Sequence, residues 1–492
     1  MRKPSAKLHQ LVNSLNKEEK KRVSIRIQEL GKKGVKHLRL FKMLTKQEVY
    51  NENALKKIFR GSALSLEKKR LYQLVMEALS QFHQNSTIEH ELLAGLQQFH
   101  ILYQKELYEQ AKTKIHQLRQ FAQKHEAFHY IQLINQQLIQ LENKVSFFSC
   151  HTDQSFQNFV DNMLLEKEQA ACATHYSILK TQIHYLFKKK KLSPDYIHQM
   201  EQLLQHDLLT SFNQANSITS HLHFLQIHST YSFLKTDYPQ SLQYSIQALE
   251  LFEKHFKTIR TAEEYMDYLQ NACTAAQYNK DHKLVAELFE KIDQNNLTIQ
   301  AERDRYELRT IEMKANWYIG IQDIDSGLQL INQNTAWLEH SKLDACAVYY
   351  CFVILSLMIK NYDHALTFLD VVLKKDNKKK KLTAPALLLK LCIYFDTQEF
   401  SLLESHVRSI QRKFNLDKKN HQVELIVVNG FRQLLQAKPS EILLILKKLH
   451  QQLSDFQTNA THTEQRTIQM SWILTWIKHK INQTPHSKAK NW

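Results

Sequence analysis

Glycine and proline are scarce in this chain. Its 492 residues include seven glycines and six prolines, where average usage would give roughly thirty-five and twenty-five. Sheets joined by tight turns need more of both, because glycine supplies positive φ angles and proline presets turn geometry. The abundant residues are instead Leu, Gln, Lys, Glu and Ala, which lose little rotamer freedom in a helix. The composition predicts an all-α protein of long helices joined by short turns.

Long apolar runs and paired cysteines are also lacking. The longest apolar run, residues 345–359, is broken by Ser356 and falls short of the roughly twenty residues that span a bilayer. The six cysteines form no Cys-x-x-Cys pair, and the first residues have no apolar core of a secretory signal. We therefore expect a cytoplasmic protein without a membrane segment, in which residues 345–359 form a buried helix.

One short motif suggests metal chemistry. His125-Glu126-Ala127-Phe128-His129 matches H-E-x-x-H, in which two imidazoles one helical turn apart hold zinc and the glutamate is the general base. A zinc metallopeptidase is therefore a remote alternative function. The sequence shows no third ligand in a fixed place, since Glu142 is only a nominal candidate, and no strand that would hold a substrate. We expect surface or packing histidines near the end of a helix, no metal or cofactor, and no enzymatic activity.

The net charge of +17 is concentrated at the amino terminus. Residues 1–70 contain twenty Lys or Arg and six Glu, a net charge of +14, whereas the rest of the chain carries only +3. Such a density of cations attracts polyanions. Three alternatives stay open: these cations bind an acidic protein, they bind a nucleic acid, or they face only solvent. The candidate binding residues are Lys20, Lys21, Arg22, Arg26, Lys32, Lys33, Lys36 and Arg39.

Residues 1–85 are predicted to form a basic module of four or five short helices. Asn16 with Glu19, and Thr45 with Glu48, match the capping box that satisfies free amides at a helix start. Glycine turns separate the expected helices, which lie at residues 23–30, 35–44, 54–60 and 64–82.

The first glycine turn suggests a helix-turn-helix. It contains Gly31 and Gly34 and joins two helices in a basic setting. If Gly31 is the turn glycine, the close-packing position four residues earlier is the bulky Ile27, where such motifs usually have a small residue. The match to a DNA-reading motif is therefore weak.

A repeated pattern begins near residue 90. After each short turn comes a large apolar residue or a proline, and a small or aliphatic residue three positions later opens the next helix. The spacings between the last four copies are 38, 38 and 39 residues, and a period near 40 with two helices per unit is typical of an α-solenoid. We expect this solenoid over residues 90–480, followed by a polar tail at 481–492. The copies begin at Tyr108, Tyr238, Ile324, Tyr362, Phe400 and Pro439.

Three of these copies resemble the start of the second helix of tetratricopeptide repeats. They are Tyr108-Glu-Gln-Ala111, Tyr238-Pro-Gln-Ser241 and Tyr362-Asp-His-Ala365. The repeats here exceed the usual 34 residues and lack the regular Trp, Leu-Gly and terminal Pro positions of that family, so the resemblance is degenerate. It implies stacked helix pairs that form a concave binding surface.

The overall layout is also similar to a family of uncharacterised bacterial proteins with a basic helical amino terminus and a tetratricopeptide-like remainder. The segments that carry this similarity are residues 7–22, 37–59, 69–79 and 102–111. The similarity implies a fold and no activity.

These observations favour a non-catalytic interaction scaffold or adaptor. A protein or peptide would bind in the solenoid groove, and the basic module would engage an acidic partner. The alternative is a nucleic-acid-binding regulator whose repeats sense a peptide or protein. The groove residues stay unassigned, because superhelical geometry decides which face of each helix turns inward.

Overall fold

The computed structural model describes residues 6–59, 63–83, 87–145, 153–189, 195–255, 262–295, 300–341, 343–375, 382–415, 421–459 and 472–483. All regular secondary structure in these ranges is helical, without a strand. The all-α prediction is therefore confirmed. Most of the expected polar tail, from residue 484 onwards, lies outside the described residues.

Contacts between residues divide the chain into two compact units. Unit 1 comprises Met1–Ser177, Ala215–His221 and His255–Thr261. Unit 2 comprises Ile178–Gln214, Leu222–Lys254 and Ala262–Trp492. The division falls inside one long helix, α9 (Asp153–Lys189).

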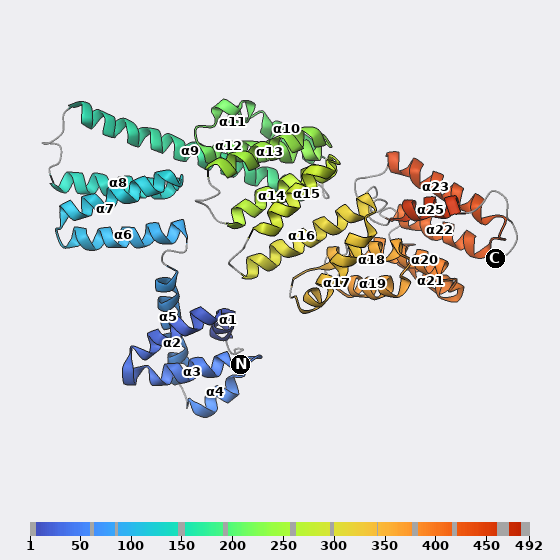
Figure 1. The fold of residues 1–492 in the computed structure, drawn as a ribbon, viewed down its shortest axis with the longest axis horizontal. Helices are drawn as coiled ribbons and strands as arrows, with labels where there is room; N and C mark the ends of the chain where they lie inside the picture. Colours follow the sequence, from blue (N-terminus) through green and yellow to red (C-terminus); the bar gives the residue numbers. More distant parts are fainter. Residues whose placement is uncertain are drawn as a thin grey trace. The chain divides into compact units, whose positions relative to one another are not determined.

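The amino-terminal part of unit 1 is a small helical bundle, which we call the N-terminal bundle (residues 6–59 and 63–83). Its third helix packs against the first, second and fifth helices, as Figure 1 shows. Its core consists of aliphatic and aromatic side chains, of which Val23, Ile27, Leu40 and Leu44 are fully buried. The expected helices are thus present. They are α1 (Lys7–Ser14), α2 (Lys17–Gln28), the 3-10 turn η1 (Gly31–Lys33), α3 (Val35–Thr45), α4 (Glu52–Ile58) and α5 (Ala63–Phe82).

The two predicted capping boxes have different outcomes. Asn16 caps α2 by accepting the amide hydrogen of Glu19, whose side chain accepts the Asn16 amide in return, so this prediction is confirmed. The prediction at Thr45 is wrong. Thr45 is the last residue of α3, and its hydroxyl donates to the Phe41 carbonyl one turn earlier. The following helix is capped by Asn51 instead, whose extended backbone suits that role.

Most of the remaining helices contact the next helix in the chain. In unit 1 these are α6 (Ile88–Gln104), α7 (Tyr108–Lys124), α8 (Phe128–Val145) and the first part of α9. The central helices are α10 (Tyr196–Leu204), α11 (Asp207–Thr210), α12 (Ile218–Leu234), α13 (Tyr238–His255), α14 (Ala262–Tyr278), α15 (His282–Gln294) and α16 (Gln300–Ile321). The last helices are α17 (Ile324–His340), α18 (Cys346–Met358), α19 (Tyr362–Lys375), α20 (Thr383–Asp396), α21 (Phe400–Asn415), α22 (Gln422–Gln436), α23 (Ile442–Asn459) and α25 (Ile473–Gln483).

The turns inside the helix pairs explain how so few glycines suffice. The residue two positions before each of six helix starts has a left-handed backbone, and none of the six is glycine. The amide that follows donates to the carbonyl five residues earlier, as in the bond from Asp323 to Tyr318, which closes a Schellman motif. The six left-handed residues are Glu106, Thr236, Lys280, Gln322, Lys360 and Gln398.

Helix α18 accounts for the longest apolar run of the sequence. It is buried along nearly its whole length and contacts α16, α17 and α19. Its apolar side chains, including the fully buried Phe352 and Val353, therefore pack against neighbouring helices. Among the residues that the structure describes, no helix combines the length and the apolar character that crossing a membrane requires.

Candidate binding site

The H-E-x-x-H segment is not a continuous helix. Helix α7 ends at Lys124 with His125 as its C-cap, Glu126 has a left-handed backbone with φ of 48°, and α8 begins at Phe128. His125 is buried with its ring 4.4 Å from that of Phe121, whereas His129 is exposed. The expectation that both lie near the end of one helix is thus wrong, because a turn separates them. The spacing that presents two imidazoles on one helical face is absent.

The carboxylate of Glu126 has a structural partner inside unit 1. Its two oxygens accept the backbone amides of Ile218 and Thr219, at 2.8 and 2.6 Å. These amides belong to the first turn of α12, where free N–H groups and the helix dipole favour a negative charge. Glu126 therefore caps a helix that begins about ninety residues later in the chain.

Glu142, the nominal third zinc ligand, is a buried carboxyl group of α8. Its side chain is 1% exposed, and burial raises its pKa to about 7. A carboxyl group with so high a pKa is a poor anionic ligand at neutral pH. In the described part of the chain, no group of three His, Cys, Asp or Glu side chains is placed to hold a metal ion.

The eight candidate cations of the N-terminal bundle occupy two helices and the turn between them. On α2, Lys21 and Arg22 are exposed and Lys20 is half-buried. Arg26 forms ion pairs with two glutamates of the bundle, 2.9 Å from a Glu29 oxygen and 3.9 Å from a Glu77 oxygen. The other four, Lys32, Lys33, Lys36 and Arg39, are exposed on η1 and α3.

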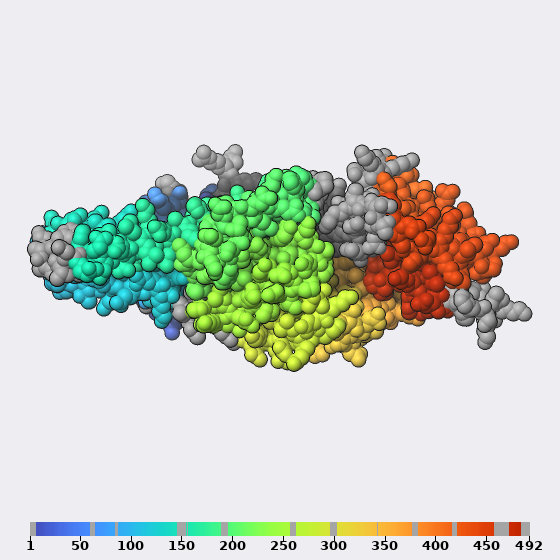
Figure 2. All heavy atoms as spheres, turned by 90° about the horizontal axis from the view of Figure 1, so that it is seen from above, coloured from blue at the N-terminus to red at the C-terminus, as the bar shows by residue number. Residues whose placement is uncertain are grey.

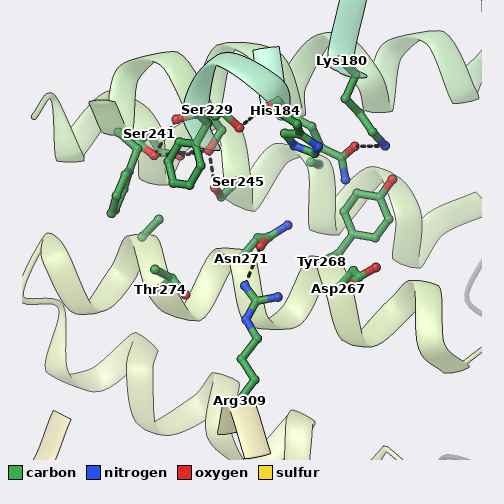
Figure 3. A pocket seen from close by; sticks show the side chains of 16 residues that line it. Lys180, His184, Ser229, Ser241, Ser245, Asp267, Tyr268, Asn271, Thr274 and Arg309 are labelled. Carbon is green, nitrogen blue, oxygen red and sulfur yellow. Dashed lines mark hydrogen bonds between the residues drawn. The ribbon is translucent and has the colours of Figure 1, made fainter. Parts of the chain in front are cut away.

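Unit 2 contains a pocket of about 430 Å³ that the sequence did not locate. Its lining comes from α9, α12, α13, α14 and α16 (Figure 3). In the space-filling view of Figure 2, the green to yellow atoms of α13 to α16 form one continuous surface. Packing of these five helices brings together lining residues that range from Lys180 to Arg309 in the sequence.

Small hydroxyl side chains form one wall of the pocket. Ser229 on α12 lies 2.7 Å from the Ser245 hydroxyl and 3.2 Å from that of Ser241, both on α13. Such small side chains let the two helices approach closely, as Figure 3 shows. Because these hydroxyls form hydrogen bonds with one another, they do not need a ligand as partner, and the bonds make this wall rigid.

Two fixed cations reach the pocket from opposite sides. Lys180 on α9 donates to the side-chain oxygen of Gln226 on α12 at 3.0 Å. Arg309 on α16 donates to the side-chain oxygen of Asn271 on α14, also at 3.0 Å (Figure 3). Each cation thus orients an amide side chain, whose NH₂ group is left as a donor for a ligand.

The pocket carries more positive than negative charge. Lys180 and Arg309 face a single lining carboxylate, that of Asp267. Burial lowers the pKa of Arg309, and Asp267 partly offsets this effect. A guanidinium that is partly removed from water gains more from an anionic ligand than one on the open surface.

Acceptors and apolar groups complete the lining. The hydroxyls of Thr230 and Thr274 donate to backbone carbonyls one turn earlier in their own helices, at 2.8 and 2.7 Å. Their oxygens therefore remain acceptors for a ligand. Phe187 and Phe233 add apolar surface, and Tyr268 is held by stacking on Phe252 at 4.6 Å. Donors, acceptors and apolar surface together suit a peptide, which has all three kinds of group.

One sequence signal points to this pocket. Asp267, Asn271 and Thr274 recur at offsets of 0, 4 and 7 in α14, a polar stripe on one helical face. Such a stripe also fits an ordinary solvated face, so the sequence alone could not assign it to a pocket. No protein-family model matches the chain, and a comparison with curated proteins found no match.

Proposed function

We propose that the protein is a non-catalytic adaptor whose repeats form an α-solenoid of tetratricopeptide-like helix pairs. The contact pattern supports this arrangement. Three first helices, α14, α16 and α20, each contact both their own partner and the next first helix. The recurring Schellman turns, which precede six of the second helices (α7, α13, α15, α17, α19 and α21), support it further.

The ligand of the pocket is an extended protein or peptide segment with an acidic group. The single observation that carries this proposal is the pair of cations, Lys180 and Arg309, held on opposite sides of one pocket with oriented amides beside them. A carboxylate placed there accepts charge-assisted hydrogen bonds from both cations. Gln226, Asn271, Thr230 and Thr274 then supply donors and acceptors for the peptide backbone.

Catalysis is not part of the proposal, because the one catalytic motif of the sequence has another use. Its glutamate caps α12 and its histidines lie on either side of a turn. The cations of the N-terminal bundle form a second binding surface of the adaptor, and its ligand is a polyanion.

The test compares two pools of fluorescent random peptides that differ only in having Glu or Gln at four fixed positions. We expect the Glu pool to bind more tightly. Arg309→Glu and Lys180→Glu should each weaken binding at least tenfold, since a charge-assisted hydrogen bond contributes about 1.5–3 kcal/mol. Fluorescence anisotropy at moderate salt measures both effects.

The matched control is Lys283→Glu, which makes the same charge change on α15 in the same unit. The Lys283 side chain is 90% exposed and lies outside the pocket lining, so binding should change less than twofold. The proposal fails if the Gln pool binds equally well, or if Lys283→Glu weakens binding as much as Arg309→Glu.

A further inference from the structure

Helix α3 of the N-terminal bundle has two chemically distinct faces. His37, Leu40, Phe41 and Leu44 are buried, and the helix contacts α1, α2 and α5. His37 anchors it through a 2.9 Å contact with a Glu67 oxygen on α5. The buried face therefore fixes the orientation in which α3 presents its other face.

The other face is basic along its whole length. Lys36, Arg39, Lys42 and Lys46 are exposed there, together with Val35, and no acidic residue occurs from Val35 to Lys46. A shallow depression of about 340 Å³ runs along this face, lined by Val35, Leu38, Arg39, Lys42, Met43 and Lys46. We call these exposed residues and the lining of the depression the α3 face.

The cations of the α3 face differ from other cations of the bundle in their neighbours. Arg26, Lys56, Lys68 and Arg70 each lie within ion-pair distance of a glutamate of the bundle. In the described residues of the bundle, no carboxylate lies within that distance of Lys36, Arg39, Lys42 or Lys46. Their charge is not neutralised within the bundle and is available to a polyanion.

We propose that the α3 face binds duplex DNA, with α3 lying in the major groove. From Lys36 to Lys46 a helix rises about 15 Å, and a B-form major groove about 12 Å wide admits one helix. Lysine and arginine along the helix then meet phosphates on the groove walls. Val35 and Met43 line the same depression as most of these cations and offer apolar contact to base edges.

Interface composition favours DNA over an acidic protein. Protein interfaces are depleted in lysine and are centred on buried aromatic or apolar anchors, whereas protein–DNA interfaces are much more positively charged. The α3 face has three lysines, one arginine and no aromatic side chain. Duplex RNA fits less well, because its A-form major groove is too deep and narrow for a helix to read.

The test titrates the full chain into three fluorescent probes, a 24-base-pair DNA duplex, the same duplex as RNA, and a glutamate-rich peptide. We expect tightest binding to DNA, falling steeply with salt because phosphate contacts release counterions. Arg39→Glu combined with Lys42→Glu should weaken DNA binding at least thirtyfold. It should also make the negative slope of log K against log salt shallower by about 2, which is one unit for each lost phosphate contact.

The control for net charge is Lys57→Glu combined with Lys69→Glu. Both lysines are exposed on the same bundle, on α4 and α5, and we expect a loss of less than threefold. Circular dichroism checks that both double variants remain folded. Arg309→Glu should bind DNA normally, which separates this proposal from the one for the pocket.

Three results would overturn the proposal. Equal loss in both double variants would show that only net charge matters. Equal binding of RNA and DNA duplexes would exclude the major groove. Preference for the glutamate-rich peptide, with the same dependence on Arg39 and Lys42, would assign the α3 face to an acidic protein.

Discussion

Replacing Gly34 by alanine is expected to destabilise the N-terminal bundle by about 2–4 kcal/mol. A Cβ atom at this position would lie 2.0 Å from the carbonyl oxygen of Ile27 and 3.2 Å from its carbonyl carbon. These are backbone atoms, so no rotamer change can relieve the overlap. Helices α2 and α3 would have to move apart, which would disturb the orientation of α3.

Gly31→Ala is the matched control. Gly31 has a φ of 57°, and nothing lies within 4 Å of a Cβ built there. The substitution should lower the free energy of unfolding by only about 1 kcal/mol, because alanine must then adopt a left-handed backbone. Native-state hydrogen exchange of residues 17–45 measures both variants locally. Equal effects of Gly31→Ala and Gly34→Ala would contradict close packing at Gly34.

Replacing Glu126 by alanine is expected to lower the local stability of the first turns of α12 by about 2–3 kcal/mol, since it removes two hydrogen bonds from backbone amides to a charged group. Hydrogen exchange of residues 215–234 should accelerate accordingly.

Glu106→Ala isolates the contribution of the cap. Glu106 occupies the equivalent turn between α6 and α7, with a φ of 58° against 48° at Glu126. Both substitutions replace a left-handed glutamate by alanine, and only that at Glu126 removes a carboxylate from a helix start. If Glu106→Ala accelerated exchange in residues 215–234 as much, capping by Glu126 would be refuted.

Local patterns in the sequence predicted much of the fold. The repeat pattern located α7, α17 and α19, because a large residue after a turn and a small one three positions later report on local packing. These helices begin at the large residues Tyr108, Ile324 and Tyr362, three positions before the small residues that were expected to open them. The cap at Asn16 was predictable for the same reason. The buried helix at residues 345–359 followed from its length alone.

Features that depend on tertiary contacts were not predictable. Glutamate, threonine, lysine and glutamine adopt left-handed turns that glycine would favour, because packing of the adjoining helices outweighs the local cost. Glu126 finds its partners near residue 218, and no local pattern links the two segments. The position of the turn at Gly31 to Gly34 was predictable from the sequence. The close approach of Gly34 to the Ile27 backbone was not, because it depends on how α2 and α3 pack.

The pocket could not be predicted for the same reason. Its cations, Lys180 and Arg309, are separated by 129 positions in the sequence and meet only because five helices pack together. Their amide partners, Gln226 and Asn271, look like ordinary exposed polar residues in the sequence. Only the placement of these helices in space reveals that four polar side chains form one site.

The most direct test of peptide binding in the pocket is site-specific photo-cross-linking. A benzophenone amino acid in place of His184, an exposed residue of the pocket lining, should cross-link to the Glu peptide pool. The same amino acid in place of Tyr185, which is 56% exposed and lies outside the lining, should not. Equal cross-linking from both positions, or cross-linking from position 185 alone, would contradict binding in the pocket.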